Sequence, residues 1–130
     1  MIISNVNVLV TDYDKAIDFY VNKLGFTLLC DVPVTAQQRW VRVAPQANSA
    51  TVSALVLTKA NAQQHHLVGN QAGDGVFLFL QSDDFWADYR RMQTAGVEFL
   101  EQPREEIYAT VVIFRDGEGN KWDLLQPKNN

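Results

Sequence analysis

Apolar and polar residues alternate along much of the chain, and this pattern predicts two runs of strands, each interrupted by one helix. Residues 2–10 alternate with a period of two, which is typical of a strand with one packed face. A helix follows, capped by Thr11 or Asp12 and ended by Gly25, because the apolar residues between these signals fall at helical spacing. Three more strands are predicted, over residues 26–34, 39–44 and 51–58.

The second half of the chain repeats this order. A strand over 75–81 is followed by a helix that Ser82 or Asp83 caps and Gly96 ends, and Leu24-Gly25-Phe26 is answered by Ala95-Gly96-Val97. Strands are then predicted over 97–100, 107–114 and 121–126. An internal repeat of this kind predicts one domain, 1–130, made of two βαβββ modules. We place the modules at 1–60 and 75–127, joined by a connector over 61–74 with a short helix near residues 60–65.

Composition narrows the class of protein. The chain has 130 residues, 47% of them hydrophobic, which suffices for one packed core. Its formal net charge of -4 argues against a nucleic-acid partner. Cys30 is the single cysteine, so no internal disulfide is possible, and we interpret it as a small core residue. No long apolar segment or signal peptide is evident, so we expect a cytoplasmic protein without a membrane partner.

Two motifs stand near the two ends of the chain. They are Val10-Thr11-Asp12 with Ala16, Phe19-Tyr20 and Leu24-Gly25-Phe26, and Phe114-Arg115-Asp116-Gly117-Glu118-Gly119-Asn120-Lys121-Trp122-Asp123-Leu124. They resemble motifs of the glyoxalase/bleomycin-resistance/extradiol-dioxygenase proteins, the vicinal oxygen chelate superfamily. The first resembles that family's opening motif, and the second its closing motif, in which a proline more usually follows the first aspartate. The resemblance implies an α+β fold of paired βαβββ modules, whose curled mixed sheets form a cup, in a homodimer.

Many members of that superfamily hold a divalent metal in the cup. The resemblance matches the metal-ligand positions to Asn5, Val56, Val76 and Asp123. Valine has no donor atom, and an amide with one carboxylate is a poor ligand set for Mg²⁺, Ca²⁺ or Zn²⁺. We therefore expect no metal and no cofactor, and neither glyoxalase I nor dioxygenase activity. The adjacent His65 and His66 are interpreted as solvated loop residues.

The ligand-binding residues that we predict lie on the concave face implied by the resemblance. This face is mostly apolar with a few polar anchors, which is usual for a small-molecule pocket. Trp40 lies either in the cup or in a core or dimer contact, and Tyr108 either in the cup or at an interface. The candidates are Asn5, Asn7, Trp40, Val56, Val76, Leu78, Tyr108 and Asp123.

Two functions remain open from the sequence. The first is a metal-independent protein that binds an apolar or cationic small molecule, such as an antibiotic or a metabolite, in the manner of bleomycin-resistance proteins. The second is a small lyase or isomerase in which Asp123 acts as general base or weak metal ligand. No Ser-His or Cys-His arrangement can be identified, so the sequence leaves open whether the protein is an enzyme.

Overall fold

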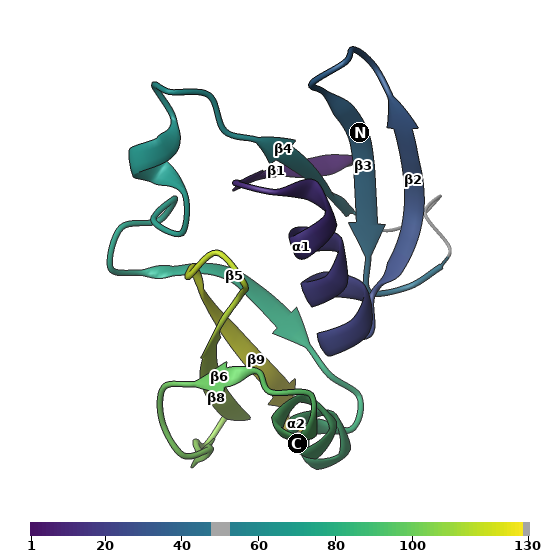
Figure 1. Cartoon of the computed structure of the whole chain (residues 1–130). Coiled ribbons are helices and arrows are strands. Elements are labelled where there is room, and N and C mark those ends of the chain that lie inside the picture. Colours follow the sequence, from purple (N-terminus) through teal and green to yellow (C-terminus); the bar gives the residue numbers. More distant parts are fainter. Residues whose placement is uncertain (48–52, 129–130) are drawn as a thin grey trace. The chain divides into compact units, whose positions relative to one another are not determined.

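A computed structural model describes residues 1–47 and 53–128. The chain divides into two compact units, Met1–Val68 and Gly69–Asn130. Each unit contains one mixed sheet and one main helical segment (Figure 1). Among the described residues, no helix combines the length and the apolar character that crossing a membrane requires.

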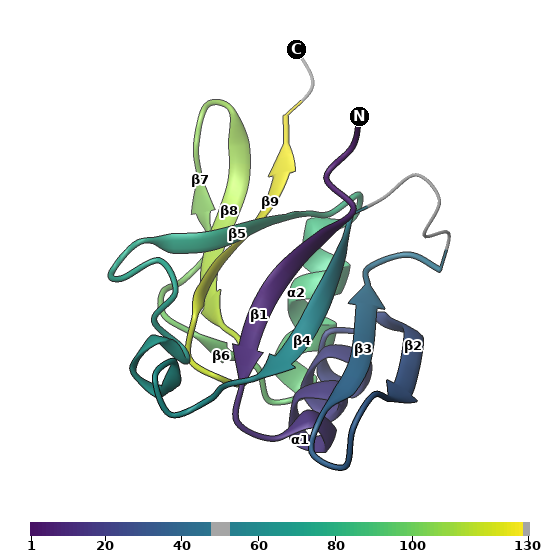
Figure 2. The same ribbon diagram turned by 90° about the horizontal axis from the view of Figure 1, so that it is seen from above.

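The sheet of the first unit has four strands in the order β1-β4-β3-β2 (Figure 2). β1 is parallel to β4, whereas the β4–β3 and β3–β2 pairs are antiparallel. The side chains of Val41, Val43 and Leu57 are fully buried on one face of this sheet. The strands are β1 (Asn5–Val10), β2 (Thr27–Pro33), β3 (Arg39–Ala44) and β4 (Ala54–Lys59).

Asp12 begins the helix of this unit, as one of the two predicted caps. Its Oδ1 accepts a hydrogen bond from the Lys15 backbone N–H at 3.0 Å, which satisfies a donor of the first turn. The helix α1 (Tyr13–Ile17) continues as the π-helical segment η1 (Asp18–Lys23). Apolar residues of α1 and η1 are buried, and α1 contacts β3 and β4. The helix therefore covers the valine-rich face of the sheet.

The sheet of the second unit runs β5-β9-β8-β6, and β7 also pairs with β8. β5 is parallel to β9, and the other pairs are antiparallel. The helix α2 (Phe85–Thr94) buries Phe85, Tyr89 and Met92. The strands are β5 (Val76–Gln81), β6 (Glu98–Phe99), β7 (Arg104–Glu105), β8 (Ala109–Arg115) and β9 (Lys121–Pro127).

The turn between β8 and β9 is built on one buried carboxylate, Asp116, which is 5% exposed. Its Oδ1 accepts hydrogen bonds from the backbone N–H groups of Glu118, Gly119 and Asn120, each at 3.0 Å. Its Oδ2 accepts from Asn120 Nδ2 and Trp122 Nε1, also at 3.0 Å. An aspartate that bonds to the backbone two or more residues ahead is a typical turn former.

Several predicted boundaries are wrong. The second helix is capped by Asp84, not by Ser82 or Asp83, because the buried Ser82 hydroxyl is taken by Asp88 and by the Asp84 N–H. The short helix expected near residues 60–65 is a 3₁₀ helix, η2 (His65–Leu67). The strand β7 lies between the strands expected over 97–100 and 107–114, where the sequence predicted no strand. The first residues of the strand expected over 51–58 lie outside the described residues.

Candidate functional site

Asp123 lies on the face of the second sheet that α2 does not cover. Its neighbours along β9, Trp122 and Leu124, are buried on the opposite face, at 2% and 1% exposure. The strand register places Asp123 between Phe79 of β5 and Ile113 of β8. Since bridge partners in a sheet point to the same side, the carboxylate is flanked by two large apolar side chains.

Few neighbouring groups offset the cost of burying the carboxylate of Asp123. Its Oδ1 is buried and accepts no hydrogen bond from any described residue. Burial raises the pKa of Asp123 above its usual value, the positive charge of Arg104 opposes this shift, and the negative charge of Glu101 adds to it. Arg104 is itself paired with Glu101 at 3.0 Å and with Glu106 at 2.7 Å. Oδ1 of Asp123 is thus a buried hydrogen-bond acceptor to which no described residue donates.

We expect Asp123→Asn to stabilise the protein at pH 7 by about 0.5 to 1 kcal/mol, because an uncharged amide is less costly to bury than a carboxylate. The raised pKa of Asp123 means that the folded protein holds a proton which the unfolded chain releases. Wild-type stability therefore falls as the pH rises from the usual value of 3.8 through the folded pKa. The advantage of the variant should grow across this window and stay constant above it. Urea denaturation at a series of pH values measures the difference in the free energy of unfolding between the variant and the wild type.

A matched control for this experiment is Asp83→Asn, which removes an exposed carboxylate from the same unit. We expect this control to change the free energy of unfolding by less than about 0.5 kcal/mol at every pH. Equal or lower stability of Asp123→Asn at pH 7 would show that the carboxylate is adequately solvated or paired.

On the first sheet, the face that the helix α1 does not cover carries a row of polar side chains. Arg42 Nε donates a hydrogen bond to Asn5 Oδ1 at 2.9 Å. The Thr58 hydroxyl donates to Asn7 Oδ1. The register places Asn7, Val56 and Arg42 side by side across β1, β4 and β3. Trp40, two residues from Arg42 on the same strand, lies on this face and is 42% exposed.

Comparison with known proteins identifies the family. Residues 2–124 match the model of the Glyoxalase/Bleomycin resistance protein/Dioxygenase superfamily. The chain belongs to this superfamily. The resemblance inferred from the two sequence motifs is confirmed, and so is the predicted α+β fold with two mixed sheets.

Two relatives of this superfamily member align with nearly the whole of its chain. An uncharacterized protein of Shewanella frigidimarina (strain NCIMB 400) is 50% identical over 125 residues, which are 95% of this chain and 92% of that protein. The uncharacterized protein YetH of Bacillus subtilis (strain 168) is 32% identical over 95% of this chain and 97% of its own length.

Two solved structures show the same fold. The crystal structure of TnmS3, an antibiotic binding protein from Streptomyces sp. CB03234, is 33% identical with a TM-score of 0.78, over 98% of this chain and 97% of that one. The crystal structure of UcmS2 is 29% identical with a TM-score of 0.82, over 96% and 97% of the two chains.

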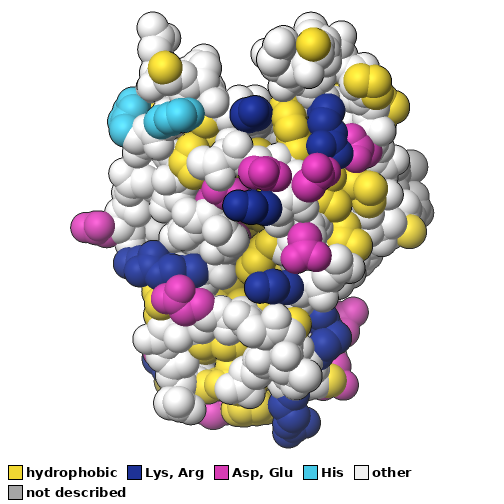
Figure 3. All heavy atoms as spheres, in the orientation of Figure 1, with side chains coloured by type: hydrophobic (Ala, Val, Ile, Leu, Met, Phe, Trp, Pro, Cys, Tyr) yellow, Lys and Arg dark blue, Asp and Glu magenta, His cyan; other side chains and the backbone are white. Residues whose placement is uncertain are grey.

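In this superfamily member, the residues at the positions matched to metal ligands are not a set that coordinates a metal ion. Val56 and Val76 have no donor atoms, and the side-chain oxygen of Asn5 already accepts a hydrogen bond from the cationic Arg42. The part of the chain that the structure describes contains no group of three or more His, Cys, Asp or Glu side chains arranged to hold a metal. His65 and His66 are both exposed on η2, where Figure 3 shows them at the surface.

The structure brings some of the predicted ligand-binding residues together within each sheet. Asn5, Asn7, Val56 and Trp40 share one face of the first sheet. In the second sheet, Val76 pairs with Lys121 on the side of Asp123. Tyr108 lies outside the strands, in the turn between β7 and β8, and is 67% exposed.

The prediction that Leu78 lies on the same face of the sheet as Asp123 is wrong. The β5–β9 register shifts between Val76 and Leu78, so Leu78 pairs with Trp122 on the side facing α2, and Phe79 takes the place beside Asp123. An extra residue of this kind reverses the alternation of a strand. Sequence reasoning also missed Arg104, since its sheet partner is known only once β7 is paired with β8.

Proposed function

We propose that this protein binds a small organic molecule without a metal, and that the ligand places an amine or hydroxyl donor on Asp123. The observation that carries the proposal is the buried, unpartnered Oδ1 of Asp123 between Phe79 and Ile113. A carboxylate in an apolar setting gains strongly from a charge-assisted hydrogen bond, while the neighbouring rings and alkyl groups favour an apolar ligand body.

The comparisons support the same class of function. TnmS3, which shares a third of its residues with this chain, is described as an antibiotic binding protein. Within the first unit, Asn5, Asn7 and Arg42 form a separate row of polar side chains linked by hydrogen bonds. We infer that the protein acts as a homodimer that sequesters or carries such a ligand.

Native mass spectrometry with elemental analysis of freshly purified protein tests this proposal directly. We expect the mass of a dimer, no stoichiometric transition metal, and an additional organic mass that denaturation releases. A stoichiometric transition metal would contradict metal-independent binding, and a monomer mass would contradict the proposed assembly.

Titration with metal-free bleomycin, a cationic antibiotic, tests the role of Asp123. In buffer containing EDTA, Asp123→Asn should weaken binding about tenfold or more, because a charge-assisted hydrogen bond contributes about 1.5 to 3 kcal/mol. The control Asp83→Asn removes the same formal charge from the same unit and should leave the Kd within about twofold. Equal affinity of wild type and Asp123→Asn would exclude the carboxylate from the bleomycin site.

A lyase or isomerase is the second candidate function, favoured by the raised pKa of Asp123, which suits a general base. Small carbonyl and epoxide substrates, tested with and without Mn²⁺, Ni²⁺ and Zn²⁺, distinguish this candidate from simple binding. Turnover that disappears in Asp123→Asn would favour an enzyme. Turnover that requires added metal would show that the conclusion about the metal-ligand positions is wrong.

A further inference from the structure

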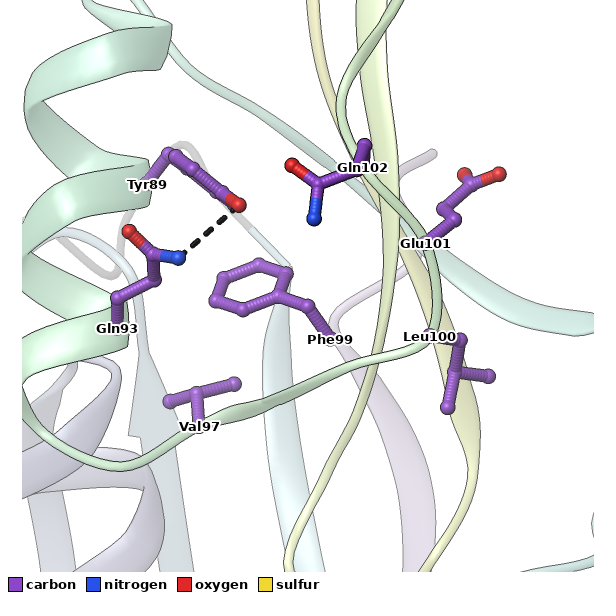
Figure 4. A pocket seen from close by; sticks show the side chains of 7 residues that line it. All are labelled: Tyr89, Gln93, Val97, Phe99, Leu100, Glu101 and Gln102. Atoms are coloured by element: carbon purple, nitrogen blue, oxygen red, sulfur yellow. Dashed lines mark hydrogen bonds between the residues drawn. The ribbon is translucent and has the colours of Figure 1, made fainter.

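The second unit contains a pocket on the side of the sheet opposite Asp123. It has a volume of about 580 Å³ and lies between α2 and the segment that follows it (Figure 4). Phe99 in its wall pairs with Phe114, which in turn pairs with Trp122 on the α2-covered face. The aromatic wall of the pocket therefore lies on the side facing α2, and the size of the pocket is within the range of small-molecule sites. Its lining consists of Tyr89, Gln93, Val97 and residues 99–102.

The apolar part of the pocket is held in place by aromatic packing. The rings of Tyr89 and Phe99 meet edge to face with centroids 4.7 Å apart. Phe99 also contacts Phe114 at 6.2 Å, and Phe114 stacks on Trp122 at 5.8 Å. Because this chain of rings ends in the buried core, the Phe99 ring has little freedom to move. It offers a flat, rigid surface to a bound ring.

The polar part of the pocket consists of neutral groups. Gln93 Nε2 donates a hydrogen bond to the Tyr89 hydroxyl at 3.1 Å, which leaves Gln93 Oε1 as an acceptor and the Tyr89 O–H as a donor (Figure 4). The carboxamide of Gln102 is exposed and supplies both a donor and an acceptor. A donor and an acceptor therefore stand at the rim, beside the Phe99 ring.

The single ionisable group of the lining besides Tyr89 is Glu101, and its charge is already matched. One carboxylate oxygen accepts from Arg104 Nε at 3.0 Å, and the other accepts from the Ile113 backbone N–H at 3.1 Å. The lining includes no Lys, Arg or His. An anionic ligand would find no positive partner in the lining to replace the water that it loses, so the pocket disfavours anions.

We propose that this pocket is a second binding site, for a small, flat, uncharged molecule with a carboxamide-type edge. The ring of the ligand packs on Phe99, and its edge exchanges hydrogen bonds with Gln93 and Gln102. The site does not depend on Asp123 or on a metal.

Benzamide and benzoate test this proposal, because they have the same shape and differ in charge. Side-chain amide signals are followed by two-dimensional ¹H–¹⁵N NMR of the full chain. Benzamide should shift the signals of Gln93 and Gln102 saturably, and benzoate should bind at least about tenfold more weakly. Gln93→Leu, a change on an exposed helix position, should weaken benzamide binding about fivefold, the effect of one lost hydrogen bond.

The control variant is Gln63→Leu, which changes an exposed glutamine outside the pocket and should leave the benzamide affinity unchanged. Three results would overturn the proposal: no saturable shift of Gln93 and Gln102 with benzamide, benzoate binding as tightly as benzamide, or equal benzamide affinity in Gln93→Leu. Because none of these readouts involves Asp123, failure of this site would leave the proposed function intact, and the reverse also holds.

Discussion

Asp116→Ala is expected to lower the free energy of unfolding by about 3 kcal/mol or more, because it removes the acceptor of a buried hydrogen-bond network. The carboxylate accepts from three backbone N–H groups through Oδ1 and from two side-chain N–H groups through Oδ2. Glu118 and Gly119 are partly exposed, so water can replace their lost bonds. Asn120 and Trp122 are each only 2% exposed, so water does not readily replace the hydrogen bonds that their side chains lose.

Urea denaturation followed by tryptophan fluorescence measures this loss, and two variants define its origin. Asp116→Asn keeps one oxygen for the backbone donors but turns an amide NH₂ toward Asn120 and Trp122, so we expect an intermediate loss. Asp74→Ala removes an exposed aspartate elsewhere in the unit and should cost less than about 0.5 kcal/mol. A loss below about 1 kcal/mol for Asp116→Ala would show that the turn forms without this carboxylate.

The alternation of residues predicted most of the strands, although not β7, and it predicted which residues of a strand share a face. Val41 and Val43 are buried and Trp40 is exposed on β3, as the period of two requires. The cap at Asp12 was among the two predicted because an N-terminal acceptor before a helical pattern is a local signal. Features that depend on a few consecutive residues were thus accessible from the sequence.

Features that depend on register were not accessible. Leu78 and Phe79 are both large and apolar, and only the irregular pairing of β5 with β9 decides which of them lies beside Asp123. Likewise, Arg42 and Asn5 are 37 residues apart in sequence, and their hydrogen bond follows from β4 lying between β3 and β1. A local pattern gives the two faces of a strand, whereas the partner strand decides what each face contacts.

The role of Asp116 had a partial signal in the sequence. The Asp116-Gly117 and Glu118-Gly119 pairs are typical of a tight turn, and an aspartate that opens a turn commonly accepts from backbone N–H groups ahead of it. The contact of its second oxygen with Trp122 required the strand that returns from the turn. This network also reaches residues before β5, since the Gln71 backbone N–H donates to Asn120 Oδ1 at 3.2 Å.

Gly69→Ala is the substitution for which we expect the second large effect, a loss of about 3 kcal/mol in the free energy of unfolding. Gly69 has a φ of 71°, where an alanine is strained by about 1 kcal/mol or more. A Cβ built there would lie 2.1 Å from the Glu118 carbonyl oxygen and 2.9 Å from its carbonyl carbon. Neither atom belongs to a flexible side chain, so the clash can be removed only if the turn that Asp116 holds shifts. Thermal and urea denaturation measure the combined cost.

Gly73→Ala separates the two contributions. Gly73 has a similar φ of 61°, but a Cβ at this position meets no atom within 4 Å. Its replacement should therefore cost only the backbone strain, about 1 kcal/mol. The difference between the two alanine variants measures how firmly the turn at 116–120 is fixed against residue 69. If both variants lose the same stability, the turn yields to the added methyl group, and Asp116→Ala should then also cost less than we expect.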